Sequence, residues 1–146
     1  MDMKIIPMTA SHAEAVIEMM RSFYASEAVL TNGSEEIFAK DVDACISGCP
    51  YLEGYVFEGA QGLQGYTMVA KSFSTEYGKP CIWIEDLYVL EAYRGTGIGT
   101  AALHFIKEKY PHALLRLEVE AENEKARRVY EACGFEVLPY MEMKKE

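Results

Sequence analysis

Apolar residues near the start of the chain recur with the spacing of a strand and two helices. A short apolar run at 3–8 predicts the strand. Residues 11–25 then place their apolar side chains on one helical face, after Ser11 and Glu14 in the spacing of a capping box. Residues 34–47 repeat the helical pattern.

The middle of the chain has the pattern of β-strands. Residues 51–58 and 63–72 flank a glycine-containing turn and predict an antiparallel hairpin. Residues 81–89 form a nearly continuous apolar run, which is typical of a strand in the middle of a sheet. Two adjacent carboxylates, Glu85 and Asp86, interrupt that run.

Helical and extended patterns alternate again in the last third. One helix runs from Ile98 until Pro111 ends it, and another follows Asn123, with Gly134 where a left-handed residue commonly ends a helix. The strands expected here are 114–119 and a final hairpin of 135–138 and 140–144.

This order of elements predicts one domain over residues 1–146 with an α/β (α+β) fold. The 146 residues are enough for a single core. We expect a mixed, mostly antiparallel central sheet of about six to seven strands, with helices on both faces.

Composition narrows the classes of function. The chain has 14 Lys and Arg against 23 Asp and Glu, a formal net charge of -9, which argues against binding to nucleic acid or anionic lipid. The sequence has neither the pattern of a signal peptide nor an apolar run near the ~18 residues of a membrane span. Its four cysteines lack zinc-site spacing, so we expect no metal and a cytoplasmic protein.

A glycine-rich turn joins the strand at 81–89 to the next helix. Glycines there let the backbone approach a ligand, and the N–H groups of the helix start favour an anion such as a pyrophosphate. The turn lacks the third glycine of a dinucleotide-binding motif, because Thr100 stands at that position, and it lacks a Walker A lysine. The alternative for such a turn is a purely structural connection.

A second motif lies on the last helix: Asn123-x-x-Ala126-x-x-x-Tyr130-x-x-x-Gly134-Phe135. With Arg94-x-x-Gly97-x-Gly99, it resembles the two acetyl-CoA-binding blocks of the GNAT superfamily of N-acetyltransferases. The order of elements is also similar to that superfamily's fold. Within it, the segments 83–89 and 93–99 are most similar to the diamine (spermidine/spermine-type) acetyltransferases.

The resemblance implies a set of cofactor-binding residues. The backbone of Leu87, Tyr88 and Val89 would pair with the pantetheine arm of acetyl-CoA, and Asn123 and Ala126 would lie against it. Tyr130 would point at the thioester sulfur. The pyrophosphate would be held, largely by backbone N–H groups, by Arg94, Gly95, Thr96, Gly97, Ile98, Gly99 and Thr100.

Acetyl transfer also needs an acid and a base. Alkyl amines are mostly protonated at neutral pH, because their pKa lies near about 10.4, so a carboxylate must remove a proton. The resemblance favours Glu85 as this base, with Asp86 either gripping the substrate amine or pairing structurally. Adjacent strand residues face opposite ways unless a bulge re-aims them. Tyr130 can protonate the leaving thiolate, and Tyr24 and Glu27 are candidates for the acceptor pocket.

The leading hypothesis is direct transfer from acetyl-CoA to a primary amine of a small molecule: a polyamine, a diamine or an amino-acid-like compound. One alternative is acetylation of a protein N-terminus or lysine, and another is a non-catalytic acyl-CoA-binding sensor. The resemblance also implies a homodimer. Residues 1–86 carry a net charge of -8 and residues 87–128 a net charge of +1, so we expect the first part to attract a cationic amine and the second to accept CoA.

Overall fold

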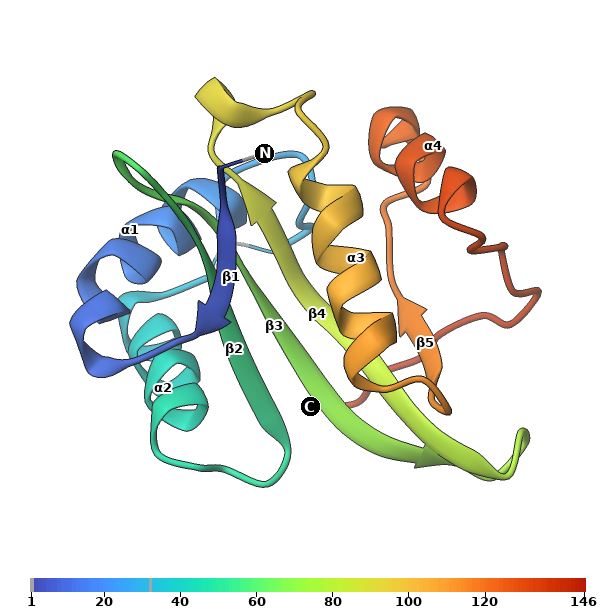
Figure 1. Ribbon diagram of the computed structural model, residues 1–146. Helices are drawn as coiled ribbons and strands as arrows, with labels where there is room; N and C mark the ends of the chain where they lie inside the picture. The colour runs from blue at the N-terminus through green and yellow to red at the C-terminus, as the bar shows by residue number, and fades with distance from the viewer. Residues whose placement is uncertain (1, 32) are drawn as a thin grey trace.

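The computed structural model of the chain describes residues 2–31 and 33–146 as a single mixed sheet with helices packed around it (Figure 1). Two short 3-10 helices, Ala10–His12 and Glu91–Tyr93, stand in the connections. The main elements are β1 (Lys4–Pro7), α1 (Ala13–Tyr24), α2 (Glu35–Ile46), β2 (Leu52–Gly59), β3 (Gly62–Ser74), β4 (Lys79–Val89), α3 (Ile98–Lys109), β5 (Leu114–Leu117) and α4 (Glu124–Ala132).

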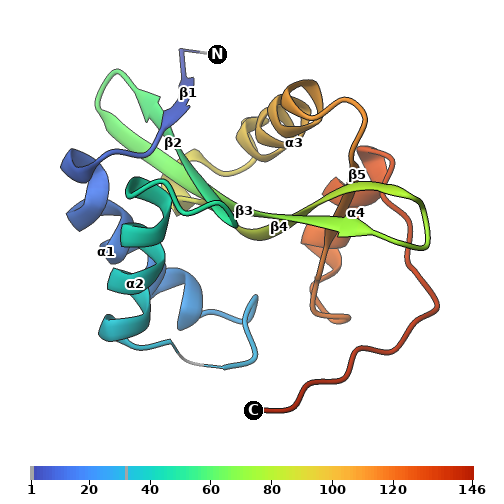
Figure 2. The same ribbon diagram turned by 90° about the horizontal axis from the view of Figure 1, so that it is seen from below.

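The strands lie in the order β1-β2-β3-β4-β5. All neighbours are antiparallel except β4 and β5, which are parallel and joined through α3. Figure 2 shows α1 and α2 on one face of the sheet and α3 on the other. The arrangement of helices on both faces is as predicted from the sequence.

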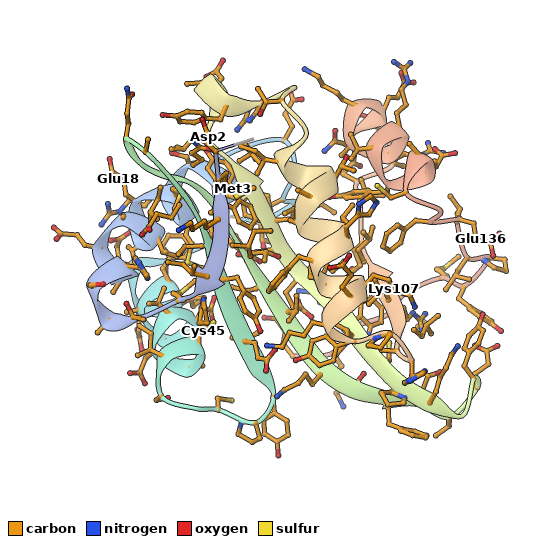
Figure 3. The ribbon with its side chains drawn as sticks, in the orientation of Figure 1. Asp2, Met3, Glu18, Cys45, Lys107 and Glu136 are labelled. Carbon is orange, nitrogen blue, oxygen red and sulfur yellow. The ribbon has the colours of Figure 1, made fainter. Side chains whose placement is uncertain are left out.

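Each face of the sheet has its own apolar core. Helices α1 and α2 cover a cluster that includes Met20, Phe38 and Tyr66. Helix α3 covers a second cluster with Leu103 and Ile106, against which the partly buried Tyr130 of α4 also packs. At the C-terminal end of α3, Lys107 (labelled in Figure 3) donates a hydrogen bond from Nζ to the carbonyl of Ala113, 3.2 Å away, just before β5. No helix of the described residues is long and apolar enough to span a membrane.

The helix starts are only partly as predicted. The Ser34 hydroxyl accepts a hydrogen bond from the Ile37 N–H at 3.2 Å and caps α2. The prediction of a capping box at Ser11 was wrong. A 3-10 turn precedes α1 instead, and there the Thr9 N–H donates to Nδ1 of His12 at 3.0 Å.

The predicted final hairpin is absent from the described residues, so the sheet has five strands rather than six to seven. Gly134 adopts the expected left-handed conformation, with φ of 94°, but the chain after it forms no strand. Residues 135–146 pair with no strand among the described residues, and most of them are exposed. Val137 and Met143 are consequently 74% and 92% exposed.

Gly65, near the start of β3, provides a test of this packing. A Cβ there would lie 2.2 Å from the Tyr88 carbonyl oxygen and 2.8 Å from the Phe57 ring. Because a backbone atom cannot move aside, we expect Gly65→Ala to lower the free energy of unfolding by about 1–3 kcal/mol, measured by urea denaturation. Gly99→Ala is the matched control. Its Cβ would meet nothing within 4 Å, so that variant should be as stable as the wild type or more stable; equal stabilities for the two variants would contradict the packing.

Candidate active site

Strands β4 and β5 separate part-way along their length. Their parallel pairing covers Cys81–Ile84 and Leu114–Leu117, and no described residue pairs with 85–89 on that side. In Figure 1 the chain after β5 rises toward α4 and away from β4. A cavity of about 110 Å³ lies at this separation. Its lining includes Glu85, Leu87, Asn123, Ala126 and Tyr130, five of the residues singled out from the sequence.

A β-bulge in β4 coincides with the separation. Met68 of β3 pairs with Asp86 and Val69 pairs with Ile84, which leaves Glu85 without a partner on β3. The extra residue reverses the alternation of the strand. Ile84 packs in the core under α3, yet Tyr88, an even number of positions further on, packs in the core under α1 and α2. The bulge that the two adjacent carboxylates would need is therefore present.

Glu85 lies where this bulge meets the cavity. Desolvation raises the pKa of Glu85, and the charges of Asp86, Asp41 and Glu142 raise it further. A carboxylate with a raised pKa is a stronger base than an ordinary glutamate, which suits removal of a proton near neutral pH.

Asp86, in contrast, lies in the core and is only 4% exposed. The Tyr24 hydroxyl donates to its Oδ1 at 2.9 Å, and the Tyr66 hydroxyl donates to its Oδ2 at 2.7 Å. Burial raises the pKa of Asp86, against the effect of these two hydrogen bonds. Asp86 lines neither this cavity nor the larger cleft described below, whereas Tyr24 lines that cleft.

Helix α4 and its N-cap bring three predicted residues, Asn123, Ala126 and Tyr130, to the cavity. Oδ1 of Asn123 accepts the Ala126 N–H at 3.3 Å and fixes the start of the helix. Tyr130 lies two turns further on, with its ring 6.0 Å from that of Phe135 in an edge-to-face contact. Its hydroxyl makes no hydrogen bond with the described residues, and burial raises the pKa of Tyr130. Tyr130 therefore stays protonated at neutral pH and has a proton to give.

The glycine-rich turn lies on the surface between β4 and α3 and lines neither cavity. Gly95 and Gly97 have φ of 76° and 90°, so the turn needs glycine at both positions. The first helical bond of α3 is from the Ala101 N–H to the Gly97 carbonyl, which leaves the N–H groups of residues 98–100 free for an anion. The Arg94 side chain donates to the Val89 carbonyl at 2.8 Å, so it fastens the turn to the end of β4.

A larger, open cleft of about 1030 Å³ adjoins the small cavity. Residues shared by both linings include Phe23, Glu85 and Tyr130. From there the cleft extends between the loop after α1, strand β5 and the C-terminal segment, with Tyr24 in its lining. Glu27 is exposed in that loop and does not line the cleft.

The cleft carries mixed charge. Six glutamates and four Lys or Arg side chains line it. Only Glu85 among those glutamates belongs to residues 1–86; the others lie at 118–142. The cleft therefore does not follow the boundary at residue 86, because residues 114–142 supply most of its charged side chains.

Glu118 and Glu142 are cleft residues that the sequence analysis did not identify. A hydrogen bond with Glu142 is the largest cause that raises the pKa of Glu118 to about 7, with smaller contributions from desolvation and from the charges of Glu142 and Glu85. The pairing of β4 with β5 indicates Glu118. Ile84 pairs with Leu117 in parallel, and Glu85 and Glu118 are the next residues on the two chains.

No gathering of His, Cys, Asp and Glu side chains suited to a metal ion occurs in the part of the chain that the structure describes. Cys133 lines the larger cleft but not the small cavity, and Cys81 is 1% exposed. Neither thiol therefore lies at the junction of the two cavities.

Comparison with known proteins connects this geometry to one family. The model of the acetyltransferase (GNAT) family matches residues 16–135. No curated protein sequence matches the chain.

Many solved structures share the fold. A possible acetyltransferase from Clostridium difficile 630 is 20% identical, with a TM-score of 0.85, covering 100% of this chain and 98% of that one. The aminoglycoside acetyltransferase AAC(6')-Iy, in complex with a CoA bisubstrate analogue, is 15% identical, with a TM-score of 0.79 and coverage of 99% and 97%. Ribosomal-protein-alanine N-acetyltransferase from Brucella melitensis biovar Abortus 2308 is 16% identical, with a TM-score of 0.74 and coverage of 99% and 98%.

The Glu118–Glu142 pair can be tested by removing one carboxylate. In Glu142→Gln, we expect the pKa of Glu118 to fall from about 7 toward the ordinary glutamate value, measured by NMR titration of the side-chain carboxyl carbons. In the wild type, the raised pKa makes the unfolding free energy decrease as the pH rises from about 4.3 toward 7, and this decrease should become smaller in the variant. Glu136→Gln is the control, and a Glu118 that already titrates normally in the wild type would contradict the pairing.

Proposed function

The chain belongs to the acetyltransferase (GNAT) family, and we propose that it transfers the acetyl group of acetyl-CoA directly to a primary amine of a small molecule. The acceptor is a polyamine, a diamine or an amino-acid-like compound. The observation that carries this proposal is the junction of two cavities at Glu85 and Tyr130, a base and an acid with raised pKa values.

The residues around the small cavity fit acetyl-CoA. The side of β4 that faces away from β3 has no strand partner over 85–89, so the backbone of Leu87 and Tyr88 and the Val89 N–H are available to an extended arm, whereas the Val89 carbonyl accepts from Arg94. The free N–H groups at the start of α3 suit the pyrophosphate. Asn123 and Ala126 line the cavity between these two places and Tyr130. When bound, acetyl-CoA supplies the activated acetyl group.

The chemistry requires two steps, each with its own proton transfers. Glu85 first removes a proton from the ammonium, directly or through water, and the neutral amine attacks the thioester carbonyl. The carbon–sulfur bond then breaks, Tyr130 gives its proton to the departing thiolate, and the proton that the nitrogen loses as the amide forms restores the Tyr130 hydroxyl. Backbone N–H groups on the open side of β4 support the carbonyl oxygen. Neither step needs a covalent enzyme intermediate.

The lining of the larger cleft supports a cationic acceptor. Glu85, Glu118 and Glu142 act on one another electrostatically at one end of it, and the aromatic side chains of Phe23 and Tyr24 line it as well. Carboxylates and aromatic faces both attract ammonium groups. The relatives of the same fold are named for aminoglycoside and protein acceptors, so a protein N-terminus or lysine is the second candidate.

We also propose that the enzyme is a homodimer. The exposed apolar side chains of the C-terminal segment, Val137, Met141 and Met143 among them, support this proposal, because they would be covered by a second copy.

Tyr130→Phe tests the acid. We expect kcat at saturating acetyl-CoA to fall about 10²–10⁴-fold, because the thiolate then leaves without a positioned proton donor. The stability should not change, since the hydroxyl makes no hydrogen bond with the described residues. Tyr51→Phe, which alters a 71% exposed tyrosine outside both cavities, is the matched control. An undiminished kcat in Tyr130→Phe at neutral pH would rule out the acid role.

A thiol-release assay over a panel of amines tests the acceptor. We expect polyamines and diamines to be acetylated with higher kcat/KM than amino acids, because two ammonium groups can engage both Glu85 and the Glu118–Glu142 pair. Aminoglycosides and peptides with a free N-terminus complete the panel. Turnover confined to peptides would favour the second candidate, and no turnover with any amine would contradict the proposed function.

A further inference from the structure

Asp86 is a buried carboxylate that the reaction above does not use. Three hydroxyl groups surround it. Tyr24 and Tyr66 donate to its two carboxylate oxygens, and the Thr67 hydroxyl donates to its backbone carbonyl at 2.7 Å. Tyr66 and Thr67 are both fully buried, so the arrangement is enclosed on the β3 side.

A carboxylate at this place is expensive, because a buried charge costs free energy unless hydrogen bonds compensate for it. An apolar residue would avoid that cost but would leave the buried Tyr66 hydroxyl without its acceptor. Asp86 and the two tyrosines therefore form one hydrogen-bonded unit. Both tyrosine hydroxyls donate to it, and an ionised carboxylate accepts both at once.

The position of Asp86 in β4 shows what these bonds hold. Asp86 is the residue where pairing with β3 resumes after the unpaired Glu85. Its carboxylate is tied to α1 through Tyr24 and to β3 through Tyr66. If Asp86 were released, β4 could return to regular pairing, and the next residue along the strand would change face.

We propose that Asp86 is a positioning residue for Glu85: its buried carboxylate, held by the Tyr24 and Tyr66 hydroxyls, fixes the bulge in β4 that places Glu85 at the junction of the two cavities. The inference rests on the proposed role of Glu85 as the base. Asp86 itself touches neither substrate.

Asp86 also acts on Glu85 through its charge. The titratable groups that face Glu85 in the described residues are all carboxyl groups: Asp86 on β4, Asp41 on α2, Glu142 of the C-terminal segment, and Glu118 after β5. Each disfavours ionisation of Glu85 when it is itself ionised. Neutralising Asp86 therefore lowers the pKa of Glu85, and the acidic limb of the profile of kcat/KM against pH moves to lower pH.

Asp86→Asn is the main test. The amide keeps the core filled, but its single oxygen accepts from only one of the two tyrosine hydroxyls, and without charge assistance, so the hold on the bulge is weakened. We expect kcat at the pH optimum to fall about 10²-fold, as for a misplacement of about 1 Å, and the acidic limb to move to lower pH. Asp41→Asn is the matched control, since it removes a nearby negative charge without touching the bulge. It should move the limb in the same direction and keep the wild-type kcat.

Tyr66→Phe separates the effect of the hydrogen bonds to Asp86 from the effect of the charge of Asp86. It removes one hydrogen bond to Asp86 and leaves every carboxylate in place, so kcat should fall while the acidic limb moves little. If Asp86→Asn behaves like Asp41→Asn, or if folded Tyr66→Phe keeps the wild-type kcat, the positioning role is overturned. Should Asp86→Asn fail to fold, the Tyr66→Phe result decides.

Two readouts do not depend on turnover. NMR titration of Glu85 in the free protein reports its pKa, and a crystal structure of Asp86→Asn reports the register of β4. If the wild type acetylates no amine, the proposed function fails, but these measurements still decide whether Asp86 fixes the bulge. A crystal structure of the variant with Glu85 still unpaired at the junction would overturn the inference.

Discussion

The opening between β4 and β5 is the constraint on which the rest of the site depends. The two strands are parallel and pair over only four residues each. Beyond that point the extra residue in β4 reverses its alternation, and the chain after β5 departs toward α4. One irregularity thereby exposes a strand edge, opens a cavity beside it and places a carboxylate at the cavity wall. A regular sheet of the same strands would have none of these three features.

The local pattern of the sequence predicted most of the fold, because helices and strands bury one face each with their own period. It failed in the last twelve residues. The alternation around Val137 and Met141 is that of a strand, but a strand also needs a partner, and these residues have none among the described residues. Whether a partner strand is present is a tertiary property that the periodicity of one segment does not contain.

The site was predictable to a similar extent. Asn123, Ala126 and Tyr130 share one helix, so their spacing alone aligned them, and all three line the small cavity. The partners of Asp86 could not be found in this way. Tyr24 is 62 positions away in the sequence and Tyr66 is 20, and the fold alone brings their hydroxyls to one carboxylate. The bulge itself has no local signal, since two adjacent carboxylates in an apolar strand are also compatible with regular pairing.

Burial at the junction of the two cavities raises the pKa of both the base, Glu85, and the acid, Tyr130. Desolvation is the largest cause that raises the pKa of Glu85 and the cause that raises the pKa of Tyr130. For the carboxylate, a raised pKa means a higher affinity for the proton of an ammonium group. For the phenol, it means that the hydroxyl keeps its proton at neutral pH, so that a proton is present when the carbon–sulfur bond breaks. Burial therefore sets the protonation state of both groups before the reaction begins. Since both line the small cavity and the larger cleft, an amine and a thioester that meet there need no intermediate carrier for the acetyl group.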